Sequence, residues 1–204
     1  MYICFAYRIF PQKSYSITAH IYTIMVRVFI AAEPSAEIRN AAASAGRSLE
    51  GCGRLSPVNA GLMHITLKFL GEIPDASIEK VRAALDSIRD SSLLPYTLSV
   101  SGVSTFGRPP RVIKADIRDG GASAKLAAEI EKRLTAAGFP KEDKPFSPHL
   151  TLARVREAGP QLAAKTAALK TAEFGSCEIR EICIKKSVLT PSGPVYTTLH
   201  RIGL

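Results

Sequence analysis

The same short pattern occurs twice in this chain, as His64-Ile65-Thr66-Leu67 and as His149-Leu150-Thr151-Leu152. Both copies lie in apolar stretches typical of β-strands, in which successive side chains point to opposite faces. In each copy the histidine and the threonine therefore share one face, and the two apolar residues share the other, buried face. A fold that holds both strands must bring two imidazoles and two hydroxyls to one site, which constrains the architecture more than any other feature.

The composition is that of a globular protein with excess positive charge. The 204 residues are 46% hydrophobic, and the net charge at pH 7 is +9. This charge indicates an anionic partner such as RNA or another phosphorylated ligand, and a basic surface that only serves solubility explains it equally well. The four cysteines include no Cys-x-x-Cys pair, which argues against a zinc ribbon or a disulfide framework. We expect free thiols and a cytoplasmic location.

Residues 1–24 differ from the remainder of the chain. They hold four of the six tyrosines and no acidic residue, and they lack the uninterrupted apolar stretch of a secretory signal. No later segment approaches the roughly 18 apolar residues of a membrane span, so we expect no membrane attachment. Because Met25 directly precedes a good strand, we expect residues 1–24 to be an N-terminal extension and Met25 to be the natural start, with one domain over residues 25–204.

The spacing of apolar residues predicts one order of elements twice: strand, helix, motif strand, helix, strand. Val26 precedes His64 by nearly the same interval as Val112 precedes His149. We interpret this as an internal duplication with pseudo-twofold symmetry, with halves of about 25–109 and 110–204. The predicted strands lie near 26–31, 62–70, 96–101, 112–117, 149–155, 177–189 and 195–202. The predicted helices run from Pro34 to Gly51, from Asp75 to Ile88, up to Gly138, and near 160–170, with a loop between Gly51 and the first motif strand.

The fold class follows from the need for both motif strands to face a common space. We predict an α+β fold of two pseudo-symmetric lobes, each with an antiparallel sheet and with helices outside. The site then lies in a central cleft between the lobes.

Two longer stretches, His64 to Gly71 and Pro148 to Arg154, resemble the paired signatures of the 2H phosphoesterase superfamily. Within it they are most similar to the RNA 2′,3′-cyclic phosphodiesterases, once labelled 2′-5′ RNA ligases. The similarity extends to 26–31, 106–113 and 187–196, and it covers about residues 25–204. It implies a bilobal fold, chemistry that needs no metal or other cofactor, and cleavage of a cyclic phosphate to a 2′-phosphate end.

The resemblance also implies roles for individual residues. By analogy with the family, His64 is the acid that protonates the departing 3′-oxygen, His149 is the base, and Arg154 contacts the substrate. Strand alternation places Arg154 on the face opposite Thr151 unless the strand twists or bulges there. A surface arginine is the alternative.

The same chemistry can be argued from the residue types. Water opens a cyclic phosphate in line, with the attacking and leaving oxygens on opposite sides of phosphorus. Histidine suits both proton transfers because its ordinary pKa of about 6.5 lies near working pH. The Thr66 and Thr151 hydroxyls can donate hydrogen bonds to the nonbridging oxygens. Residue types alone leave open which histidine is the acid.

A zinc site is the less favoured chemical alternative. Two histidines supply too few ligands, and the next positions on the two strand faces hold Lys68 and Ala153, neither of which suits zinc. Lys68 is expected on the His64 face, either near a phosphate or in solvent. Phe69 is expected in the core on the Ile65 face.

The leading prediction is an enzyme, a monomer, that hydrolyses 2′,3′-cyclic phosphate ends of RNA or small cyclic-phosphate nucleotides, ADP-ribose cyclic phosphate included. Phe106 and Phe146 either stack on a base or pack in the interior. One alternative is a 2′-5′ RNA ligase, although no P-loop or adenylation-type lysine motif is present to drive joining. The other is a non-catalytic RNA-end binding protein, against which the two histidines argue, because binding alone needs only Arg and Lys.

Overall fold

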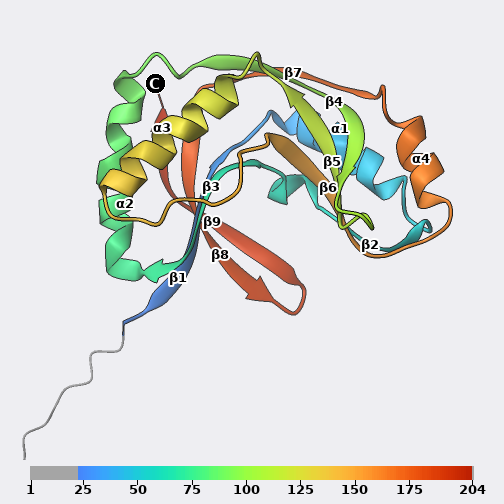
Figure 1. Cartoon of the computed structure of the whole chain (residues 1–204), viewed down its shortest axis with the longest axis horizontal. Coiled ribbons are helices and arrows are strands. Elements are labelled where there is room, and N and C mark those ends of the chain that lie inside the picture. The colour runs from blue at the N-terminus through green and yellow to red at the C-terminus, as the bar shows by residue number, and fades with distance from the viewer. Residues whose placement is uncertain (1–22, 204) are drawn as a thin grey trace, which may run out of the picture.

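The computed structural model describes residues 23–203, and it consists of two antiparallel sheets with helices packed on them (Figure 1). The prediction for residues 1–24 falls almost entirely outside the described residues. One sheet has four strands in the order β3-β1-β8-β9, and the other has five in the order β2-β6-β5-β4-β7. The predicted α+β fold with an antiparallel sheet in each lobe is therefore confirmed.

The elements follow one another in this order along the chain: β1 (Met25–Ala32), α1 (Ala36–Arg47), β2 (Gly53–Pro57), η1 (Ala60–Leu62), β3 (Ile65–Pro74), η2 (Asp75–Ser77), α2 (Ile78–Asp86), η3 (Ser87–Asp90), β4 (Tyr96–Phe106), β5 (Val112–Arg118), α3 (Ala122–Ala136), β6 (His149–Ala158), α4 (Leu162–Ala168), β7 (Glu173–Ile179), β8 (Glu181–Thr190) and β9 (Gly193–Gly203). Helices α2 and α3 pack on the four-stranded sheet, whereas α1 and α4 pack on the five-stranded sheet.

The two sheets do not correspond to the two predicted halves of the chain. The predicted boundary near 109–110 falls in the turn between β4 and β5, and these two strands pair with each other. Likewise β1, near the start of the domain, pairs with β8, near its end. Each sheet therefore combines strands from both halves. The internal duplication itself is a statement about sequence and stays a prediction.

Two predicted segments are wrong in detail. The expected loop after Gly51 contains a short edge strand, β2, that pairs with β6. Its five residues include Gly53 and Pro57 and only one apolar side chain, so no alternating pattern marks it. The expected single strand at 177–189 is two strands, β7 and β8, which belong to different sheets and meet at Arg180.

The helix α1 lies directly against the second motif strand. Ser35 caps its first turn by accepting a hydrogen bond from the Ile38 amide at 3.5 Å. A side chain at Gly46 would place its Cβ 2.8 Å from the Leu152 carbonyl oxygen. Only glycine allows this close approach, so the contact at Gly46 fixes the distance between α1 and β6.

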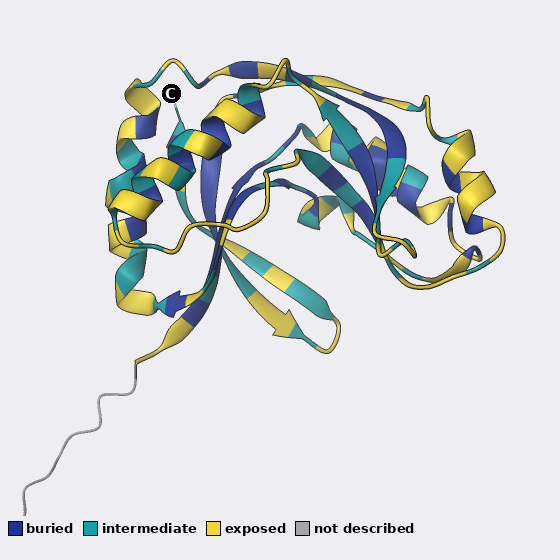
Figure 2. Cartoon of the chain, in the orientation of Figure 1, coloured by how far each residue is buried: buried dark blue, intermediate teal, exposed yellow. Residues whose placement is uncertain are grey.

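The buried faces of the motif strands behave as the alternating pattern predicts. Ile65 and Leu67 are at most 3% exposed, and Leu150 and Leu152 are completely buried (Figure 2). Burial of large aliphatic side chains contributes about 1.5 to 3 kcal/mol each. Packing in the core therefore fixes both motif strands through the face opposite their histidines and threonines.

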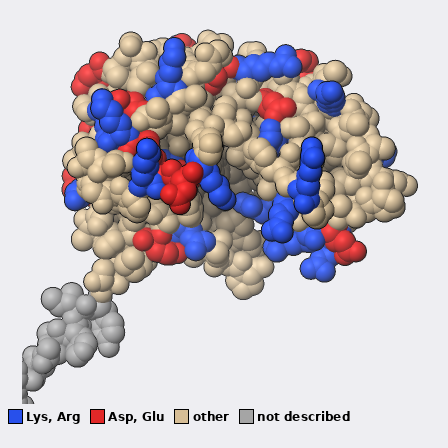
Figure 3. Space-filling model, in the orientation of Figure 1, with Lys and Arg blue, Asp and Glu red and all other residues tan. Residues whose placement is uncertain are grey.

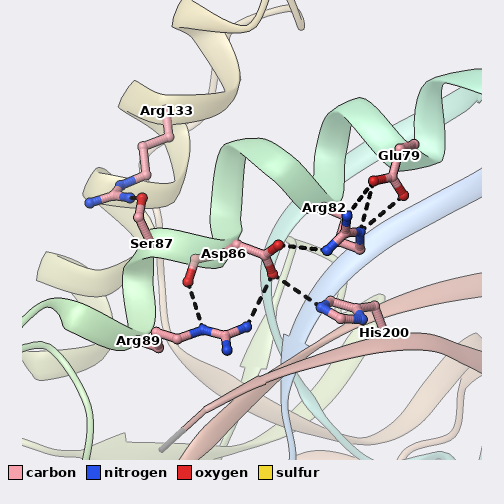
Figure 4. Close-up of polar contacts among 7 residues, drawn as sticks. All are labelled: Glu79, Arg82, Asp86, Ser87, Arg89, Arg133 and His200. Carbon is pink, nitrogen blue, oxygen red and sulfur yellow. Dashed lines mark hydrogen bonds and ion pairs between the residues drawn. The ribbon is translucent and has the colours of Figure 1, made fainter.

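A cluster of polar side chains connects α2 and η3 to α3 and to β9 (Figure 4). The Asp86 carboxylate accepts hydrogen bonds from Arg82 at 2.7 Å, Arg89 at 3.3 Å and His200 Nε2 at 3.1 Å. Arg133 of α3 donates to Ser87. His200 is thus a structural contact of β9.

Candidate active site

The two motif histidines are held in the same way. His64 lies directly before β3, and His149 is the first residue of β6. Each Nδ1 lies near the carbonyl oxygen two residues earlier, at 2.8 Å from Leu62 and at 2.7 Å from Ser147. A carbonyl only accepts, so we assign the proton of each neutral ring to Nδ1. Each Nε2 is therefore left for the chemistry.

The structure brings two of the four motif side chains together at one cavity, whereas His64 and Thr151 are not among the residues that line it. Thr66 and His149 line a common cavity of about 710 Å³, between β3, α3 and the loop that precedes β6. Burial lowers the pKa of His64, and the nearby charge of His149 lowers it further. Thr151 lies two positions along β6 from His149 and hence on the same face.

A β-bulge follows the threonine in β3. Thr66 pairs with Ala31 and Phe69 pairs with Phe29, so that Leu67 is an extra residue between them. Because Ala31 and Phe29 are two apart on β1, they share a face, and so do Thr66 and Phe69. Phe69 is 48% exposed and lines the cavity. The prediction that Phe69 lies in the core was wrong, because the bulge reverses the alternation.

The same bulge turns Lys68 away from Thr66. Lys68 pairs with Ile30, which faces the helices, and it is only 3% exposed. Its ammonium donates to the Pro140 carbonyl at 2.8 Å and pairs with Glu131 of α3 at 2.7 Å. Lys68 lines the same cavity as Thr66, but it is not a solvated side chain, because these two partners hold its ammonium group. It fastens the start of the loop that leads to His149.

An equivalent bulge in β6 puts Arg154 on the strand face of Thr151. Thr151 pairs with Lys114 and Arg154 pairs with Val112, while Leu152 lies between them beside a shift in register. Lys114 and Val112 share a face of β5, and so Arg154 shares a face with Thr151. Arg154 is exposed, and its charge helps to lower the pKa of His149. The conflict with strand alternation is thus resolved by the bulge.

A lysine and a carboxylate accompany each histidine. Burial lowers the pKa of both imidazoles, and Lys185 and Lys114 lower it further at His64 and His149 respectively. Lys185 forms an ion pair with Glu33, and Lys114 forms one with Asp116. These carboxylates raise the two histidine pKa values again without cancelling the effect of burial.

Aromatic rings enclose the two histidines unequally. His64 stacks on Phe29 at 4.8 Å between centroids and meets the edge of Tyr196 at 5.3 Å. His149 has one aromatic contact among the described residues, the edge of Phe106 at 5.0 Å. Burial raises the pKa of Tyr196, and the charge of Arg154, from the other sheet, opposes that rise.

Residues 57–188 match the 2′-5′ RNA ligase superfamily. The chain belongs to this superfamily. The predicted resemblance to the 2H phosphoesterases is thereby confirmed.

Relatives within the superfamily resemble the chain over most of its length. The RNA 2′,3′-cyclic phosphodiesterase of Archaeoglobus fulgidus is 31% identical over 177 residues, covering 86% of this chain and 98% of that protein. The RNA 2′,3′-cyclic phosphodiesterase of Aeropyrum pernix is 35% identical over 144 residues, covering 68% and 80%.

Solved structures in the same group share the fold. The protein TT0787 of Thermus thermophilus superposes with a TM-score of 0.74 at 28% identity, covering 87% of this chain and 97% of that one. Escherichia coli LigT complexed with 3′-AMP gives a TM-score of 0.70 at 26% identity, covering 89% and 99%.

Within residues 23–203, no three His, Cys, Asp or Glu side chains lie close enough together to hold a metal ion. Over the same residues, none of the helices is long and apolar enough to cross a membrane.

The sequence did not predict that Tyr196 and two lysine–carboxylate pairs lie near the histidines. Tyr196 ends a stretch that resembles the family, which is the one signal that pointed to it. Lys114, Asp116, Lys185 and Glu33 carry no motif, and only the sheet pairing brings them to the histidines. Phe106 touches His149, and Phe146 lines the cavity beside it.

Proposed function

We propose that this protein is a phosphodiesterase that opens 2′,3′-cyclic phosphate ends of RNA, or of small nucleotides, to 2′-phosphate ends. The observation that carries the proposal is that Thr66 and His149, from His-x-Thr strands of different sheets, line one cavity, and that the charge of His149 acts on His64. The relatives named RNA 2′,3′-cyclic phosphodiesterase support the substrate, because the alignment spans almost the whole of the Archaeoglobus fulgidus protein.

In the proposed reaction, His149 Nε2 takes a proton from water as the water oxygen bonds to phosphorus. The bond from phosphorus to the 3′-oxygen breaks, and that oxygen takes a proton from His64 Nε2. The products are a 2′-phosphate and a 3′-hydroxyl. Thr66 and Thr151 donate hydrogen bonds to the two nonbridging oxygens, whose charge grows in the transition state. No metal or other cofactor takes part in this scheme.

The neighbouring charges are similar at the two histidines, and Arg154 is the main difference. A base must begin the reaction neutral, and at His149 Lys114 and Arg154 disfavour the positive charge while Asp116 favours it. An acid must begin protonated, and at His64 the Glu33 carboxylate favours the charged form while Lys185 disfavours it. The assignment of acid and base therefore rests on the family resemblance.

The cavity offers a place for the terminal nucleoside. Phe69 and Phe106 both line it, and exposed aromatic rings stack readily on bases. Its volume of about 710 Å³ lies within the range of small-molecule sites.

The test is a product assay on an RNA oligonucleotide that ends in a 2′,3′-cyclic phosphate, with EDTA present. The wild type should produce a 2′-phosphate, and His64→Ala and His149→Ala should each lose about 10²- to 10⁴-fold in rate. His200→Gln is the matched control, because His200 contacts Asp86 rather than the cavity. Absence of ring opening, or full activity in both alanine variants, would contradict the proposal.

The superfamily's name makes RNA joining the second candidate. Microscopic reversibility lets the same two histidines join a cyclic phosphate to a hydroxyl end, at a low equilibrium yield. Adding an RNA with a free 5′-hydroxyl to the assay measures it, and we expect far less joining than hydrolysis. Tight binding of the cyclic-phosphate RNA without turnover would instead favour a non-catalytic RNA-end binding protein.

A further inference from the structure

Four exposed arginines lie around the end of β6 farther from the histidines: Arg54, Arg111, Arg154 and Arg156. We call them the arginine strip. None of them forms an ion pair or a side-chain hydrogen bond with another of the described residues. Among the other described arginines, some, such as Arg82, are paired with carboxylates, whereas Arg39, Arg47, Arg108 and Arg118 have no ion pair either but lie outside this group. Unpaired guanidinium groups gathered in one region favour an anionic ligand.

The strand register shows that the strip is contiguous. Arg154 pairs with Ser56 of β2 on one side and with Val112 of β5 on the other. Arg54 is two residues before Ser56, and the carbonyl of Arg111 accepts a hydrogen bond from the Val155 amide at 2.9 Å. Figure 3 shows Lys and Arg side chains gathered beside the hollow at the centre of this face. One carboxylate, Glu157, lies opposite Arg54 without forming an ion pair.

The strip begins at the active site and runs away from it. Arg154 shares a face of β6 with Thr151, and its charge lowers the pKa of His149. A strand advances about 3.3 Å per residue, which places Arg156 about 15 Å along β6 from Thr151. This is too far for Arg156 to touch a terminal cyclic phosphate bound at the threonines.

We infer that the arginine strip binds backbone phosphates on the 5′ side of the cyclic end, so that the preferred substrate is an RNA strand rather than a mononucleotide. This inference rests on the proposed function and deepens it. Arginine suits the role because its planar guanidinium binds phosphate oxygens through two hydrogen bonds. A mononucleotide fills the cavity but has no phosphate to offer Arg54 or Arg156.

The experiment compares kcat/KM for cytidine 2′,3′-cyclic phosphate with kcat/KM for an RNA hexamer that ends in the same group. The double variant Arg54→Gln with Arg156→Gln should lower the hexamer value by about five- to tenfold at low salt. Its mononucleotide value should stay within about twofold of the wild type, because no upstream phosphate is involved. The salt dependence of hexamer cleavage should weaken by roughly one unit of log–log slope.

The matched control is Arg47→Gln with Arg118→Gln, which removes the same charge from exposed positions at the end of α1 and at the end of β5. This control should behave as the wild type on both substrates. Equal losses in the two double variants, or a wild type that does not prefer the hexamer, would overturn the inference and leave the proposed function standing.

A binding measurement separates the two proposals. If neither substrate is opened, the proposed function fails, and fluorescence anisotropy with a labelled hexamer ending in a 3′-phosphate still tests the strip. Weaker binding in Arg54→Gln with Arg156→Gln than in the control pair supports the strip, and equal binding refutes it.

Discussion

The two half-sites of the cavity share a construction and differ in what surrounds it. In each, a histidine bonds a carbonyl two residues earlier, a threonine follows two residues later, and a bulge comes next. Beyond the bulge, one half has the exposed Phe69, which lines the cavity, and the other has the exposed Arg154. Repeated backbone geometry thus holds the two histidines in the same way, whereas the residues after the bulges differ in chemistry, and we propose that one serves a base and the other a phosphate.

The side chains around the two imidazoles also differ. His64 contacts Phe29 and Tyr196, whereas His149 contacts Phe106 and lies near Arg154. His64 therefore has one aromatic contact more than His149, and each histidine also has a lysine near it. If the proposed mechanism holds, the neighbours of each histidine, and not the motif itself, must distinguish the acid from the base.

The first prediction concerns the equivalence of the threonines. Thr66→Val and Thr151→Val should each lower kcat by about 100-fold, because each removes one hydrogen bond to the phosphate in the transition state. Single-turnover ring opening measures both. A large loss in one variant and none in the other would show that the two half-sites do not share the charge of the phosphate.

The second prediction concerns a structural difference between the bulges, since Lys68 follows one and Ala153 follows the other. Lys68→Met should lower the free energy of unfolding by about 2 to 3 kcal/mol, because it leaves Glu131 and the Pro140 carbonyl without their partner. Urea unfolding measures the change. Lys132→Met is the control, because that lysine is 78% exposed and its contact with Glu129 is long, at 3.5 Å. Equal stability of the two variants would contradict the role of Lys68.

A smaller change is expected in the pH profile. Glu33 raises the pKa of His64, so Glu33→Gln should lower that pKa and move the alkaline limb of kcat/KM to lower pH. Asp116 raises the pKa of His149, so Asp116→Asn should move the acidic limb to lower pH instead. Shifts of about half a unit are expected. If each variant moved the other limb, the acid and base would be exchanged.

Much of the site was predictable because it depends on local alternation. The period of two in the motif strands placed His64, Thr66, His149 and Thr151 on shared faces, and the buried partners followed from the same rule. The helices α1, α2 and α3 were likewise marked by apolar stripes, but α1 ends at Arg47 before the predicted Gly51, and the helix predicted from Asp75 to Ile88 is divided into η2, α2 and η3.

The missed features depend on partners that are distant in the sequence. The bulge at Leu67 exists because β3 pairs with β1, and nothing within the motif reveals the extra residue that turned Lys68 and Phe69 to unexpected faces. The strand β2 is stabilised by pairing with β6, about 100 residues away on the chain, as judged from its register. The order of the elements along the chain likewise did not show that each sheet combines strands from both halves.

A cyclic substrate whose 3′ bridging atom is sulfur tests the paired roles of the two histidines. A thiolate leaves without protonation, so this substrate no longer needs an acid. His64→Ala should lose about 10³-fold on the oxygen substrate and less than about tenfold on the sulfur substrate, while His149→Ala should lose similar amounts on both. Equal losses of His64→Ala on the two substrates would contradict the assignment of His64 as the acid.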